Sequence, residues 1–181
     1  MFEAQANLPL SRGRWTLGRY LAERSSAPVP PVAHAGDDAL HVVKLAVNAP
    51  IPSAVYVVSE VERYLGVITD ARLTREVFAH LDPSLAFDPQ RAHALGDLRR
   101  LGEDAAAVKA RDLMEAGVSA LGEHETLTEA LRALYRAERE ELPVVNAEGK
   151  LVGVVRALDL LREWLEDTLQ VRLGDETESF Y

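Results

Sequence analysis

The chain has 181 residues, of which 48% are hydrophobic and 27% charged, and its formal net charge at pH 7 is -9. This length suits one domain or two small ones, and the composition is that of an ordinary soluble globular protein. The negative charge argues against a protein that follows nucleic-acid phosphates, because such a protein needs a basic face. With no cysteine in the chain, disulfides, thiolate catalysis and cysteine-based zinc sites are excluded.

No targeting or membrane segment is predicted. The start of the chain lacks the basic region followed by an apolar stretch that is typical of a signal peptide. Nowhere do about 18 apolar residues follow one another, as a membrane-spanning helix requires. The sequence therefore predicts a soluble, cytoplasmic protein.

The first half of the chain carries alternating signals for helices and strands. The pair Asp37-Asp38 offers an N-cap, and Leu40, Val43 and Val47 then give one apolar helical face. A further run of helical periodicity follows, which either Thr69 or Asp70 can cap. In chain order, these signals predict a helix over residues 15–23, an extended proline-rich segment over 25–31, a helix from 38, strands over 53–58 and 64–68, and a helix to about 81.

The second half repeats this order after a long connection, in which a leucine stripe predicts a linker helix. Thr126 and Glu129 have the spacing of a capping box. Gly149 lies in a turn between two short β-branched runs, which predicts a hairpin. The predicted elements are a short helix over residues 110–114, a strand over 118–121, a helix over 126–140, a hairpin over 142–155 and a helix to about 165, followed by an acidic, solvated tail.

An internal repeat underlies this order. Residues 55–78 align with residues 142–165 without a gap, and 7 of the 24 positions are identical. Gly66 and Gly153 are one identical pair, each in the second strand of its hairpin. The shared element order makes duplication the better account of these matches. Two copies of a helix–strand–helix–strand–strand–helix unit predict an α/β (α+β) fold, with small sheets packed together and flanked by helices.

Four stretches of the second copy share the motifs of a known family. They are Val108–Met114 (VKARDLM), Thr126–Ala130 (TLTEA), Leu142–Val145 (LPVV) and Gly149–Leu160 (GKLVGVVRALDL). Through them the second copy resembles a CBS domain, the repeat named after cystathionine β-synthase. The first copy resembles it more loosely, through residues 38–47 and 55–81. A tandem pair of CBS repeats is called a Bateman module.

This resemblance implies a division of the chain and a mode of action. We expect an N-terminal extension over residues 1–14, a first CBS repeat over 15–81, a helical linker over 82–109, a second CBS repeat over 110–166 and an acidic tail over 167–181. Bateman modules usually form homodimeric discs, bind adenosine-type ligands in clefts between the repeats, and regulate a partner. We expect no metal, and no cofactor other than a possible regulatory adenosine nucleotide.

The family's strand-to-helix turn has the pattern Gly-apolar-apolar-Thr/Ser-x-x-Asp. There the hydroxyl contacts phosphate or ribose, and the Asp accepts hydrogen bonds from the ribose hydroxyls, a role that a carboxylate at a helix start can fill. This chain divides the motif between its copies. The first copy has Thr69 but carries Arg72 in place of Asp, whereas the second has Asp159 but carries Arg156 in place of the hydroxyl.

Three interpretations of the second copy remain open. In the first, Asp159 binds the ribose of a nucleotide while Arg156 binds a phosphate. In the second, Arg156 pairs with Asp159 and fills the cleft, which leaves a degenerate module. In the third, both are solvated residues at the start of a helix. The corresponding position of the first copy, around Thr69 and Arg72, is the weaker candidate because a cation replaces the ribose acceptor.

The resemblance also implies main-chain and apolar contacts to the ligand. The residues concerned are Leu142, Pro143 and Val144, which border the adenine, and Val118, Ser119 and Ala120 on the opposing strand. In the first copy Tyr56 takes the place of Pro143, and we expect it to pack on a neighbouring strand.

No nucleophile, catalytic base or metal set is visible; His124-Glu125, for example, begins like a zinc-protease helix but lacks the second His. The leading hypothesis is a homodimeric sensor of AMP, ADP, ATP or S-adenosylmethionine. The alternative is a ligand-free dimerisation or scaffold protein.

Overall fold

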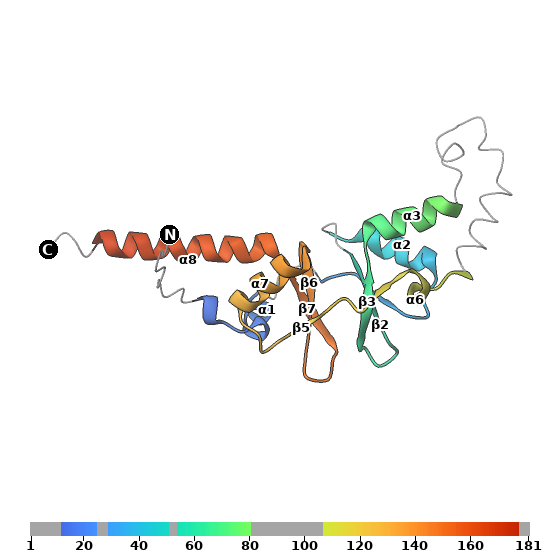
Figure 1. Cartoon of the computed structure of the whole chain (residues 1–181), viewed down its shortest axis with the longest axis horizontal. Coiled ribbons are helices and arrows are strands. Elements are labelled where there is room, and N and C mark those ends of the chain that lie inside the picture. The colour runs from blue at the N-terminus through green and yellow to red at the C-terminus, as the bar shows by residue number, and fades with distance from the viewer. Residues whose placement is uncertain (1–11, 25–28, 51–53, 81–106, 178–181) are drawn as a thin grey trace, which may run out of the picture. The chain divides into compact units, whose positions relative to one another are not determined.

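The computed structural model describes residues 12–24, 29–50, 54–80 and 107–177, which fall into two compact units. Unit 1 comprises the described parts of residues 1–25, 120–146 and 152–181, and unit 2 those of residues 26–119 and 147–151. Each unit contains a small sheet with helices beside it (Figure 1). The predicted fold class is confirmed. The predicted linker helix falls almost entirely outside the described residues.

Unit 2 is built on a sheet with the strand order β1-β2-β3-β4. Its described elements are β1 (Val32–His34), α2 (Ala39–Asn48), β2 (Val55–Val58), β3 (Tyr64–Ile68), α3 (Asp70–His80), α6 (Ala110–Leu113) and β4 (Glu115–Ala116). Strand β1 is parallel to β2, and the other pairs are antiparallel. Helices α2 and α3 lie beside this sheet (Figure 1), and Val42, Val57, Ile68 and Leu73 are among the buried residues that fill the space between the layers.

Unit 1 is built on a sheet with the order β5-β6-β7. Its described elements are η1 (Arg12–Arg14), α1 (Leu17–Glu23), β5 (Leu121–Gly122), α7 (Leu127–Ala137), β6 (Glu141–Val145), β7 (Leu151–Arg156, apart from its first residue) and α8 (Ala157–Thr177). Pro143 lies in the central strand although it has no N–H to donate. The next two residues of this strand, Val144 and Val145, pair with β5.

Two helix N-caps meet in each unit. In unit 1 the caps of α1 and α7, Thr16 and Thr126, form a β-bridge. The residue after each cap donates its backbone N–H to the carbonyl of the residue before the other cap, at 2.8 and 3.1 Å. In unit 2 the caps of α2 and α6, Asp38 and Lys109, repeat this arrangement at 3.0 and 2.8 Å. Each unit therefore includes a short helix that is distant in sequence from the helix whose cap it meets: α1 is distant from α7, and α6 from α2.

The predicted helix from Asp38 is confirmed, but of its predicted apolar face only Val43 packs against the core. The Asp38 carboxylate accepts the His41 backbone N–H at 2.8 Å, as an N-cap does. Leu40 is 41% exposed and Val47 75% exposed, whereas Val42 is completely buried. The buried side of α2 faces a core built from β1, β2, β3, α3 and α6, and a sequence pattern within one helix does not contain the positions of these other segments.

The C-terminal helix continues further than predicted. The sequence suggests a solvated tail from about residue 166, yet α8 extends to Thr177, and Asp167 within it is only 4% exposed. Among the described residues, no helix has both the length and the apolar character needed to cross a membrane. The predicted strand over residues 118–121 is wrong for residues 118–120, since β5 comprises only Leu121–Gly122.

Candidate functional site

The candidate residues of the second repeat lie mainly at one end of the β6–β7 hairpin. Arg156 ends β7, and Asp159 follows in the first turn of α8. The side chains of Leu142, Pro143 and Val144 on the neighbouring strand β6 are buried. A contact of these three residues with a ligand would therefore involve mainly their backbone.

The remaining candidate residues lie elsewhere. Val118 and Ser119 belong to unit 2 and Ala120 to unit 1, all in the connection between β4 and β5. The Thr69 hydroxyl accepts the Arg72 backbone N–H at 3.3 Å and so caps α3. The Nε atom of Arg72 is buried and has no hydrogen-bond partner among the described residues.

Asp159 is paired with an arginine that none of the three interpretations included. Its Oδ2 atom lies 3.3 Å from Nη1 of Arg24, at the C-cap of α1, and its Oδ1 atom lies 4.0 Å from Nη1 of Arg162. The Asp159 and Arg24 side chains are 27% and 30% exposed. The carboxylate is thus partly accessible and faces two cations.

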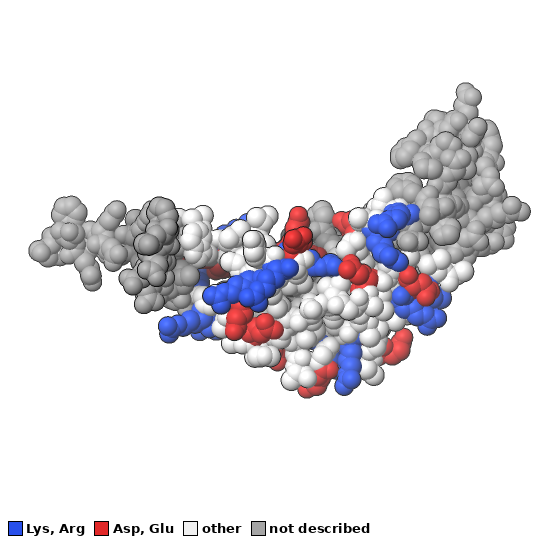
Figure 2. All heavy atoms as spheres, viewed as in Figure 1, with Lys and Arg blue, Asp and Glu red and all other residues white. Residues whose placement is uncertain are grey.

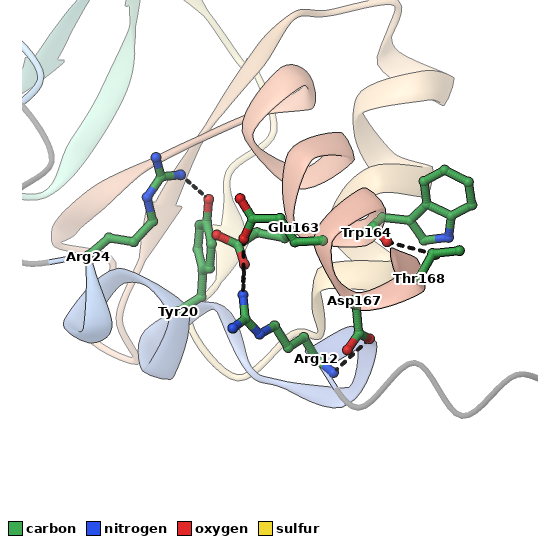
Figure 3. A network of polar contacts seen from close by, with 8 residues as sticks. Arg12, Tyr20, Arg24, Glu163, Trp164, Asp167 and Thr168 are labelled. Atoms are coloured by element: carbon green, nitrogen blue, oxygen red, sulfur yellow. Dashed lines mark hydrogen bonds and ion pairs between the residues drawn. The ribbon is translucent and has the colours of Figure 1, made fainter. Parts of the chain in front are cut away.

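Tyr20 holds the guanidinium of Arg24 in place (Figure 3). Arg24 Nη1 donates a hydrogen bond to the Tyr20 hydroxyl, and the guanidinium carbon lies 5.3 Å from the centre of the phenol ring. Burial raises the pKa of Tyr20, although the Arg24 hydrogen bond opposes that change. Burial of Arg24 acts to lower its pKa, but Tyr20 and Asp159 outweigh this effect and raise it. Arg24 is therefore a permanently charged group on a fixed support.

Arg156 has a different partner from the one considered in the degenerate interpretation. Its Nε atom donates to Glu141 Oε2 at 3.1 Å, so it joins the last residue of β7 to the first residue of β6. Both side chains are largely shielded, with exposed fractions of 27% and 18%. The structure therefore does not form an Arg156–Asp159 pair.

Sequence reasoning missed Tyr20, Arg24 and Glu141. The spacing of Tyr20 and Arg24 places them one helical turn apart, so their mutual contact was foreseeable. The approach of Arg24 to Asp159 was not foreseeable, because these two residues come from opposite ends of the chain.

A second polar network joins η1 to the middle of α8 (Figure 3). Arg12 Nη1 lies 2.6 Å from Glu163 Oε2, and the Arg12 backbone N–H donates to Asp167 Oδ2 at 3.3 Å. The hydrogen bond to Glu163 is the main cause of a raised Arg12 pKa. The network therefore attaches η1 to α8 within unit 1.

Described residues of unit 1 line at least two cavities. One, of about 200 Å³, adjoins Arg12, Leu160 and Trp164, and the other, of about 900 Å³, is an open groove along α7 and the start of α8. Neither is lined by Asp159. Asp159 and Arg24 therefore lie outside both.

The face shown in Figure 2 has no broad basic area among the described residues. Lys and Arg side chains there are interspersed with Asp and Glu. No group of three or more His, Cys, Asp or Glu side chains in the described part of the chain could hold a metal ion.

Residues 109–166 match the family model described as CBS domain. Hypoxic response protein 1 of Mycobacterium tuberculosis is 38% identical over 52 residues, which is 29% of this chain. The match spans only 36% of that relative's length.

Solved structures extend the likeness to most of the chain. The CBS domain of a CBS domain containing membrane protein from Sphaerobacter thermophilus has a TM-score of 0.62 and 20% identity, covering 84% of this chain and 89% of that one. CBSX2 of Arabidopsis thaliana, a CBS-pair protein, in complex with AMP has a TM-score of 0.56 and 20% identity, covering 87% and 98%. Residues 109–166 are a CBS domain, and the chain has the fold of a tandem CBS pair, a Bateman module.

Proposed function

We propose that this chain is a regulatory module that senses an adenosine-containing ligand, drawn from AMP, ADP, ATP and S-adenosylmethionine, and that it catalyses no reaction itself. The CBS-pair fold supports this proposal, as does the solved AMP complex of a structurally similar CBS-pair protein. Ligand binding would act by favouring one of two arrangements of the protein, and a regulated partner would respond to that arrangement.

The observation that carries the proposal is the position of Asp159. Its carboxylate lies in the first turn of α8, directly after the Gly153-containing strand, where the family pattern has its ribose acceptor. The side chain is 27% exposed, so its oxygens are within reach of a ligand. A carboxylate can accept several hydrogen bonds, and its contact with Arg24 leaves capacity for the two hydroxyls of a ribose.

A ligand panel tests the proposal. A ligand that binds only the folded protein raises its melting temperature with increasing dose. At least one of AMP, ADP, ATP and S-adenosylmethionine should do so, and Asp159→Asn should abolish the shift. Asp70→Asn, at the corresponding helix start of the first repeat, is the matched control and should retain it.

The alternative, a ligand-free scaffold, is favoured by a different observation. Asp159 and Arg156 already have charged partners within unit 1, namely Arg24 and Glu141. If no ligand of the panel shifts the melting temperature at millimolar concentration, the scaffold function replaces the sensor.

A further inference from the structure

Arg24 has donor groups to spare. Its Nη1 atom makes both of its described polar contacts, with the Tyr20 hydroxyl and with Asp159 Oδ2. A guanidinium carries five N–H donors in a planar fork. Among the described residues, the Nε and Nη2 donors of Arg24 have no partner, while its side chain is 30% exposed.

The support beneath Arg24 is rigid. Tyr20 is only 3% exposed, and its ring and hydroxyl both contact the guanidinium (Figure 3). Asp159 restrains the same group from α8. A cation held in this way loses little conformational entropy when it binds an anion. The smaller ordering cost increases the affinity for the anion.

The charges around Asp159 favour an anion. Asp159 faces the guanidinium groups of Arg24 and Arg162, whereas the acidic groups nearby have other partners. Glu163 lies 2.6 Å from Arg12, and Glu141 lies 3.1 Å from Arg156. One carboxylate between two guanidiniums leaves a local excess of positive charge, which would repel the sulfonium centre of S-adenosylmethionine and attract a phosphate.

We propose that Arg24 is a phosphate-binding residue that makes the Asp159 site selective for nucleoside phosphates over S-adenosylmethionine. Asp159 accepts the ribose hydroxyls while the Nε and Nη2 donors of Arg24 bind a phosphate of the same ligand. This inference rests on the sensor function proposed above, and it gives the site a phosphate contact that does not require Arg156 to leave Glu141.

Calorimetric titration of the full chain with AMP, adenosine and S-adenosylmethionine tests the inference. A charge-assisted hydrogen bond corresponds to an affinity ratio of roughly tenfold or more. We expect AMP to bind at least about tenfold more tightly than adenosine. Arg24→Gln should weaken AMP binding by about that factor and leave adenosine within about twofold. Arg19→Gln, which removes an exposed arginine of the same helix paired with Glu23, should change neither affinity.

The outcomes separate the two proposals. If no ligand binds the unmodified chain, the sensor function and this inference both fall. If AMP binds but Arg24→Gln leaves the ratio of AMP affinity to adenosine affinity unchanged, or strengthens AMP binding, only the role of Arg24 is overturned. The same holds if S-adenosylmethionine binds the unmodified chain more tightly than AMP does. If Arg24→Gln does not fold, Arg24→Lys takes its place, because it keeps the charge but lacks the planar fork. We expect this variant to lower the ratio of AMP affinity to adenosine affinity several-fold. An unchanged ratio in this variant would also overturn the role of Arg24.

Discussion

Gly153 lies so close to Leu21 that a Cβ atom on the glycine would be only 2.8 Å from Leu21 Cδ1. The missing side chain lets α1 pack directly on β7 in unit 1. Gly66, the equivalent residue of the first repeat, has the same role in unit 2, where an added Cβ would lie 2.6 Å from the Glu115 backbone oxygen and 3.2 Å from Met114 Sδ. The repeated glycine therefore accommodates, in each unit, a segment from elsewhere in the chain.

We predict that Gly66→Ala is more destabilising than Gly153→Ala. At Gly153 the obstacle is the end of a leucine side chain, which can shift, whereas at Gly66 it is a backbone carbonyl. Overpacking of this kind costs about 1–3 kcal/mol. We expect Gly66→Ala near the upper end of this range and Gly153→Ala near the lower end. Urea denaturation measures the difference in unfolding free energy.

Truncation of the neighbour provides the control. In Leu21→Ala/Gly153→Ala the obstacle is removed, so the second substitution should cost less than it does alone. Glu115→Ala retains the backbone oxygen and should not rescue Gly66→Ala. Rescue at Gly66, or equal costs at the two glycines, would contradict this account of the packing.

The sequence was sufficient for features encoded within a few residues. The Thr126–Glu129 capping box and the hairpin turn at Gly149 are present as predicted. Features that depend on distant segments were not predictable in the same way. The exposed side of α2 at Leu40 depends on the distant segments that form the core beside this helix. The partner of Asp159 is Arg24 at the C-cap of α1, which comes from the other end of the chain.

The Glu141–Arg156 pair should stabilise the β6–β7 hairpin. The two charges join the strands at their ends, at 3.1 Å and with less than a third of either side chain exposed. A double-mutant cycle of Glu141→Gln, Arg156→Gln and the double variant should give a coupling free energy of about 0.5–1 kcal/mol, since solvent still screens the pair. A coupling free energy indistinguishable from zero would mean that the pair orients the two side chains without stabilising the hairpin.

The capping box should make stability depend on pH. The Glu129 carboxylate accepts the Thr126 backbone N–H at 2.8 Å and the Thr126 hydroxyl at 2.9 Å, and these bonds lower its pKa from the ordinary value of 4.5. A carboxylate whose pKa is lower in the folded state stabilises the protein above its unfolded pKa, and this contribution is lost as the pH falls through the folded pKa.

Glu129→Gln should therefore be less stable than the unmodified chain at pH 7, and the difference should shrink as the pH falls below about 4.5. Parallel urea titrations between pH 7 and pH 3 measure it. Glu60→Gln, at an exposed position after β2, controls for the loss of one negative charge. A difference that stays constant across this range would show that the cap acts without its charge.

A homodimer is the expected assembly, and α8 offers a surface for it. Leu158, Leu161 and Leu165 follow one another at helical spacing and are 77%, 44% and 50% exposed in the single chain. Burying such residues against a second copy would remove apolar area from water. We expect light scattering to give a dimeric mass at micromolar concentration.

Leu161→Glu/Leu165→Glu should weaken this dimer, because two carboxylates would have to be buried or displaced on association. We expect the dissociation constant to rise by at least about tenfold, so that the monomer predominates at low micromolar concentration. Val61→Glu, a 63% exposed valine in the β2–β3 turn, is the matched control and should remain dimeric. A monomeric mass for the unmodified chain would refute the dimer itself, whereas a dimer unaffected by the α8 variant would place the interface on another surface.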